Sequence, residues 1–166
     1  MKVKTRVLVI LVLAAVLAAA YVPAIGLAKG IKTEFSGTEC LVAPLAGGTS
    51  KPLGNGAVHT TGLELLYRDE TSDPRTTGDA YIVVNMVLDP STGSGPMWGT
   101  IEIVNELGSW SGFWNGRMDN WSFSIRAVAH GSGAYEGLVG YWNYERPGQV
   151  PCYGLSGYVV ETGAGE

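Results

Sequence analysis

Apolar and polar residues alternate along much of the chain, most clearly in residues 110–118 and 121–130. With Asp119 and Asn120 as the connecting turn, the two segments form a hairpin in which Met118 is opposite Trp121. One face then collects only apolar residues and glycines: Trp110, Gly112, Trp114, Gly116 and Met118, with Trp121, Phe123, Ile125, Ala127 and Ala129. The other face is mainly polar. A period of two with one apolar face predicts two neighbouring strands of a half-buried antiparallel sheet.

A similar pattern of short strands and turns extends over the whole chain after about residue 30. Short runs rich in β-branched and aromatic residues are separated by Gly, Pro, Asn and Asp, which favour turns. We expect strands at 32–40, 59–68, 79–88, 97–105, 110–118, 121–130, 138–144 and 153–161. Eight short strands joined mainly by short connections predict an all-β domain, a single antiparallel barrel that is closed or nearly closed, with a sandwich as the alternative.

Two segments do not follow the simple pattern. Residues 79–88 are apolar on both faces, so the strand would be covered on its outer face by a neighbour or a loop, or lie in a subunit interface. The apolar residues are Ile82, Val83, Val84, Met86, Val87 and Leu88. Residues 41–58 contain Pro44 and several glycines, and the sequence leaves open whether they form a lid over the barrel mouth or a disordered excursion. On the inner face, Gly112 and Gly116 are expected to leave room for large rings.

The first 28 residues have the pattern of a secretory signal peptide. Lys2, Lys4 and Arg6 precede an uncharged apolar stretch at 7–22, and Pro23 is followed by the small residues Gly26 and Ala28. We expect cleavage after Ala28, which leaves residues 29–166 as one domain with no stable membrane anchor; an uncleaved anchor is the alternative. The protein is therefore expected to be secreted, extracellular or periplasmic.

The charge of the chain bears on its partners, and its cysteine content bears on its redox compartment. The formal net charge is −4, and removal of the three cations of the leader would make it about −7. An acidic surface repels phosphates, which argues against nucleic acid as a partner. The two cysteines, Cys40 and Cys152, are expected to form a disulfide in an oxidising compartment.

No residue pattern points to a metal or a cofactor. The chain has two histidines, His59 and His130, without ligand spacing around either, and no Gly-x-Ser-x-Gly nucleophile motif. The catalytic candidates are single polar groups, Glu102, Asn85 and Tyr67. Glu102 shares a strand face with Trp98, and a buried unpaired carboxylate there would be costly unless it were used.

The aromatic residues suggest a ligand site. All five tryptophans lie between positions 98 and 142, and a barrel of eight strands can enclose one small molecule. The predicted cavity wall consists of Trp98, Trp110, Trp114, Trp121, Phe123 and Trp142. A core filled by these same side chains is the alternative.

Residues 131–140, Gly-Ser-Gly-Ala-Tyr-Glu-Gly-Leu-Val-Gly, resemble the corresponding segment of plant allene oxide cyclases. Dirigent proteins, which share the barrel, have a similar turn but carry arginines at the positions of Glu136 and Val139. The resemblance covers about 113–144. It implies an eight-stranded antiparallel, calycin-type barrel with an apolar cavity, no cofactor and often a homo-oligomeric state. Glu136 matches the turn glutamate of that family, where it is expected to hold the turn or a neighbouring strand, and no catalytic residue is carried over.

Three functions remain open at this point. The first is binding of a small apolar or aromatic ligand in the barrel interior. The second is a cofactor-free isomerase or cyclase that acts by confinement. The third is an extracellular structural or protein-interaction module with a filled barrel, which bare apolar side chains at Ile82, Val84 and Met86 would favour.

Overall fold

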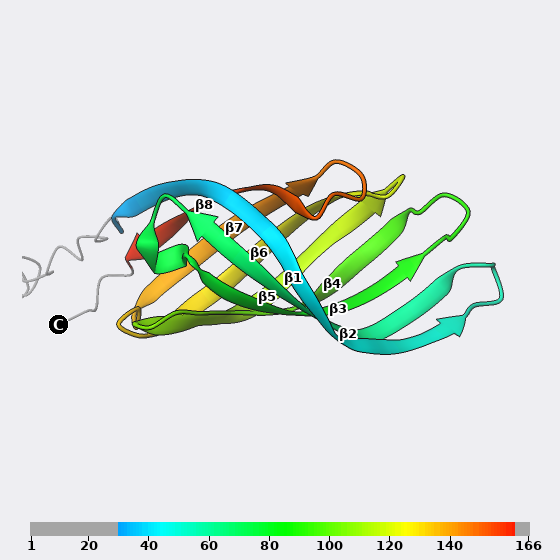
Figure 1. Cartoon of the computed structure of the whole chain (residues 1–166), viewed down its shortest axis with the longest axis horizontal. Helices are drawn as coiled ribbons and strands as arrows, with labels where there is room; N and C mark the ends of the chain where they lie inside the picture. The colour runs from blue at the N-terminus through cyan, green and yellow to red at the C-terminus, as the bar shows by residue number, and fades with distance from the viewer. Residues whose placement is uncertain (1–29, 162–166) are drawn as a thin grey trace, which may run out of the picture.

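The computed structural model describes residues 30–161, which form one closed antiparallel sheet (Figure 1). Each strand pairs with the next in sequence and β1 pairs with β8, so the sheet is a closed barrel and not a sandwich. The strands are β1 Lys32–Pro52, β2 Val58–Thr71, β3 Gly78–Leu88, β4 Gly95–Val104, β5 Gly108–Asp119, β6 Ser122–Gly133, β7 Leu138–Arg146 and β8 Cys152–Glu161. All eight predicted strands are present. The expected signal peptide lies outside the described residues.

Helical structure in residues 30–161 is limited to a single 3₁₀ turn, η1 Pro74–Thr76. Asp73 caps this turn by accepting a hydrogen bond from the Arg75 backbone N–H at 3.0 Å. Within this part of the chain no helix is long and apolar enough to span a bilayer.

One end of the barrel is closed by four aromatic side chains, which are Phe35, Trp110, Tyr135 and Trp142. Each is at most 4% exposed. Trp142 meets Phe35 and Trp110 edge to face at 5.6 and 5.5 Å, and Trp110 stacks on Tyr135 at 5.3 Å. The Trp110 indole N–H donates to the Arg75 carbonyl at 2.7 Å, which ties the cluster to η1. This half of the interior is a filled core.

Strand β1 is much longer than the sequence indicated. Its pairing with β8 ends at Cys40 and Cys152, but its pairing with β2 continues to Pro52 and Val58. Figure 1 shows the resulting β1–β2 hairpin projecting beyond the other strands. Residues 41–52 are therefore strand, neither a disordered excursion nor a loop-like lid. They lack alternation because most are exposed on both faces.

The β5–β6 hairpin has the predicted faces but a different register. Met118 pairs with Phe123 and Asp119 with Ser122, so the two-residue turn is Asn120-Trp121. Both turn residues have positive φ, 47° and 64°, as a type I′ turn requires. The Trp121 ring packs over Gly93, and the Trp121 backbone N–H donates to the Gly93 carbonyl at 3.1 Å. A shift by two residues keeps every side chain on its face, which is why the alternation did not reveal it.

Glycines do make room for rings, but not at the predicted positions. A Cβ added at Gly112 or Gly116 would mainly contact the backbone of β6 and, at Gly116, also the Ile125 side chain. A Cβ added at Gly140 would instead overlap the Trp142 ring and lie 3.3 Å from the Trp110 ring. Close strand approach explains the first two glycines, and ring packing explains Gly140.

We expect Gly140→Ala to lower the free energy of unfolding by about 1–3 kcal/mol, because the added methyl overpacks the aromatic cluster. Gly154→Ala on β8 is the control, since a Cβ there meets nothing within 4 Å, and we expect it to be neutral or slightly stabilising. Chemical denaturation of both variants checks the result. Equal stability of the two variants would contradict this account of the cluster.

Candidate functional site

The other half of the barrel interior is not filled and contains a cavity of about 190 Å³. It lies towards the end where the β3–β4, β5–β6 and β7–β8 turns are found. Several of its wall residues are only partly buried, among them Leu63, Met86 and Ile125. The cavity therefore reaches the surface at this end, whereas the aromatic cluster closes the opposite one.

Most of the wall is apolar and comes from β2 to β6. Its side chains are Leu63, Leu65, Ile82, Val84, Met86, Met97, Ile101, Trp114, Met118, Phe123 and Ile125. Trp114 is fixed by a hydrogen bond from its indole N–H to the Thr100 carbonyl at 3.1 Å. The methionines are flexible and polarizable, so this wall can adapt to the shape of a small ligand.

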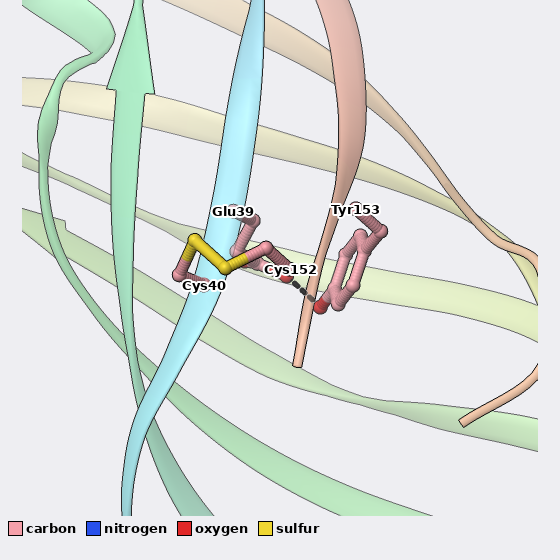
Figure 2. The surroundings of a disulfide bond; sticks show 4 residues. All are labelled: Glu39, Cys40, Cys152 and Tyr153. Atoms are coloured by element: carbon pink, nitrogen blue, oxygen red, sulfur yellow. Dashed lines mark hydrogen bonds between the residues drawn. A yellow bond between two sulfur atoms is a disulfide. The ribbon is translucent and has the colours of Figure 1, made fainter. Parts of the chain in front are cut away.

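The remaining wall is polar and comes from the neighbouring strands β7, β8, β1 and β2. It consists of Glu39, Tyr67, Tyr144, Arg146 and Tyr153. Glu39 is directly opposite Asp69 on β2 and directly opposite Tyr153 on β8. The Tyr153 hydroxyl donates a hydrogen bond to Glu39 Oε2 (Figure 2). Three polar side chains thus form one row across three strands.

Glu39 and Asp69 form a buried carboxyl pair, only 3% and 0% exposed. Burial raises the pKa of Glu39 well above its usual range, and the neighbouring Asp69 adds to the rise. Burial also raises the pKa of Asp69 to about 7, although contacts with Glu39, Arg68 and Tyr144 oppose the rise. Two adjacent buried carboxyls cannot both ionise readily, so the pair holds at least one proton at neutral pH.

Hydrogen bonding around the pair is incomplete. Neither Asp69 oxygen has a hydrogen bond of normal geometry, and the Tyr144 hydroxyl also lacks one, although the two groups lie close enough to influence each other's pKa. Burial raises the pKa of Tyr144, with Asp69 and Glu39 adding to the effect. Tyr144 therefore stays a neutral proton donor beside the acids.

Tyr67 is the third hydroxyl of the polar wall. Burial raises its pKa to about 12, with a further increase from Glu39 and a decrease from Arg146. Among the described residues it has ring contact with Tyr153 at 6.0 Å but no hydrogen bond from its hydroxyl. Tyr67 thus offers a free donor to the cavity.

Arg146 ends β7 at the rim of the cavity. Its guanidinium lies 4.5 Å from the centre of the Phe123 ring, a cation–π contact. Its Nε is buried without a hydrogen-bond partner, and none of the ion pairs in residues 30–161 includes it. An unpaired cation is thus placed where an apolar cavity opens.

The predicted Cys40–Cys152 disulfide is confirmed. Figure 2 shows the disulfide next to Glu39, which precedes Cys40 in sequence, and Tyr153, which follows Cys152. Because the cysteines are paired residues of β1 and β8, the bond joins the strands at the last position of their ladder. It therefore holds the polar row together at the point where β1 leaves β8.

Four of the six aromatic residues predicted to line a cavity are inside the barrel. Trp114 and Phe123 line the cavity, whereas Trp110 and Trp142 belong to the filled aromatic cluster. The prediction is wrong for Trp98 and Trp121, each 39% exposed. Trp98 faces outwards and lies 6.0 Å from the His59 ring, and Trp121 occupies the β5–β6 turn.

The catalytic candidates are also separated. Glu102 is exposed on the outer face, in phase with Trp98, so burial gives it no catalytic role. Asn85 faces outwards too, where its side-chain oxygen accepts a hydrogen bond from the Gly62 N–H at 3.1 Å and holds a bulge in β2. Tyr67 alone of the three reaches the cavity.

Two further expectations are corrected. Ile82, Val84 and Met86 line the cavity and are not a bare outer patch, which removes the feature that would favour an interaction module. In the 131–140 turn, Glu136 is exposed and its side chain has no hydrogen bond or ion pair to residues 30–161. Tyr135 holds that turn instead, through a 2.8 Å hydrogen bond to Asn105.

The carboxyl pair was missed because isolated acids in a strand are usually solvated. A signal was present in the strand alternation: Glu39 is in phase with inward-facing Phe35, and Asp69 is in phase with Leu65 and Tyr67.

No cluster of three or more potential metal ligands exists among the described residues. No protein-family model matches the chain, and no curated protein matches its sequence.

Proposed function

We propose that this protein binds a small, largely apolar molecule in the half-open barrel cavity. The observation that carries the proposal is a preformed space of about 190 Å³ with an apolar wall on one side and a few polar groups on the other. Sites for small molecules have this composition. An apolar cavity of about 150 Å³ holds a benzene molecule, so the size suits one ring or a short branched chain.

The expected export of the protein forms part of the same proposal. The disulfide supports it, because such bonds persist in oxidising compartments. A relationship to allene oxide cyclase-like and dirigent-like barrels also remains a proposal, supported by eight antiparallel strands in a closed sheet.

Methionine methyl groups offer a direct test. The chain has four methionines, and the three in the described residues, Met86, Met97 and Met118, all line the cavity. In protein labelled with ¹³C at the methionine methyls, we expect toluene to shift these three signals in a saturable manner.

The matched controls are Val84→Phe, which fills the cavity, and Val128→Phe, which adds the same ring to the outer face of β6. The shifts should disappear in the first variant and persist in the second. Toluene shifts that are linear and identical in both variants would refute ligand binding in the barrel.

A second candidate is a cofactor-free isomerase, favoured by the carboxyl pair that holds a proton at the cavity wall. Such a pair could give and take a proton. The test is exchange of the α-protons of cyclohexanone for deuterium, followed by NMR. We expect exchange above the buffer rate that is lost in Glu39→Gln; exchange at the buffer rate with the native protein would exclude this activity for that ketone.

A further inference from the structure

The polar groups of the cavity differ in what they can offer a ligand. Tyr153 already donates its proton to Glu39, and Glu39 is engaged with Asp69 and Tyr153. Tyr67 and Arg146 are different, because neither the Tyr67 hydroxyl nor the Arg146 Nε has a hydrogen-bond partner among residues 30–161. The Tyr144 hydroxyl also lacks a partner, but it lies beside the unpartnered Asp69 oxygens. Away from the carboxyl pair, the free polar capacity of the cavity therefore consists of donors.

The charged groups of the cavity wall also favour a ligand that accepts hydrogen bonds, because the charge without a partner is positive. Arg146 is always ionised and forms no ion pair within the described part of the chain. The acid on the same wall, Glu39, forms no ion pair with Arg146, because its carboxyl is engaged with Tyr153 and Asp69. Tyr67 and Arg146 both line this cavity, and the charge of Arg146 lowers the pKa of the Tyr67 hydroxyl against the effect of burial. A group that accepts hydrogen bonds and carries one negative charge would satisfy both.

We propose that the ligand is a small monocarboxylate, with its anionic group at Arg146 and Tyr67 and its apolar part among Met97, Ile101 and Trp114. This inference rests on the proposed binding function and specifies its ligand class. A carboxylate matches the planar donor fork of arginine. Arg146 lies at the rim, so the charged group would remain near solvent while the apolar part fills the chamber. The volume limits that part to about one ring.

Benzoate and toluene separate the two proposals, since they share a ring and differ in the carboxylate. Both are titrated into protein labelled at the methionine methyls, using the native chain, Arg146→Met and Arg126→Met. Methionine keeps the apolar stem of Arg146 over Phe123, and Arg126 is an exposed arginine on the outer face of β6. Retention of the native methyl spectrum by each variant confirms that the fold is intact.

Arg146→Met should weaken benzoate binding at least about tenfold, the effect of one charge-assisted hydrogen bond, and leave toluene binding within about twofold. Arg126→Met should change neither. If toluene binds but benzoate does not, or if Arg146→Met leaves benzoate affinity unchanged, the monocarboxylate inference is overturned and ligand binding stands. If neither molecule binds, the proposed function itself fails.

Discussion

Replacing both cysteines by serine is expected to lower the free energy of unfolding by about 3–5 kcal/mol. Cys40 and Cys152 are 112 residues apart, and cross-linking so distant positions removes much of the conformational freedom of the unfolded chain. The native ladder adds a local effect, because the β1–β8 pairing ends at the disulfide and is followed by one further hydrogen bond, from the Leu41 N–H to the Pro151 carbonyl at 2.8 Å. Chemical denaturation of Cys40→Ser/Cys152→Ser against the oxidised native protein measures the change.

Hydrogen exchange can locate the local part of this effect. The variant should lose protection first in the β1–β8 ladder near Glu39 and Tyr153, whereas amides of the β4–β5 ladder should follow global unfolding. Stability within about 0.5 kcal/mol of the native protein, a size typical of neutral surface changes, would contradict the proposed role of the bond.

The second large effect concerns pH. The unfolded chain ionises Glu39 and Asp69 near pH 4, whereas burial keeps them protonated in the fold to higher pH. Over that range the folded state binds more protons than the unfolded state, so stability falls as pH rises. For Asp69 alone, a pKa raised from 3.8 to about 7 corresponds to about 4 kcal/mol lost between pH 4 and pH 8.

Glu39→Gln should remove much of this dependence. The glutamine carbonyl can still accept from Tyr153 and its amide can donate to Asp69, so the row is kept while one buried acid is lost. We expect a gain of the order of 2 kcal/mol or more at pH 8 and no gain at pH 4. The measurement is denaturant unfolding across this pH range.

Glu102→Gln on the exposed face of β4 is the matched control and should leave the pH profile unchanged. Lower stability of Glu39→Gln than of the native protein at pH 8 would mean that ionised Glu39 stabilises the fold, contrary to the burial argument.

Alternation was a sufficient guide to the strands and their faces but not to their pairing. Met118 faces inwards in both the predicted and the observed β5–β6 register, so burial cannot distinguish them. The observed turn requires a tryptophan at positive φ, which is disfavoured locally and is offset by packing of Trp121 on Gly93. That contact joins two hairpins and cannot be read from either one.

The candidate site was predicted less well for a related reason. Sequence patterns identified an aromatic interior, but large rings fill space as readily as they surround it, and Trp110 and Trp142 form core. The division between filled and hollow halves depends on how side chains from all eight strands meet. Glu39 and Asp69 become a site only because β1 and β2 place them opposite each other.

A crystal structure of the protein under xenon pressure tests the central claim, a preformed cavity beside the buried carboxyl pair. Xenon enters apolar cavities, so it should occupy the apolar side of this one. We predict a xenon atom between Met97, Ile101 and Trp114, with these side chains in the positions that the structure shows. We predict no xenon within the aromatic cluster around Trp142. A barrel without xenon, in which the methionine and leucine side chains have closed the space, would contradict the account and leave a filled structural core.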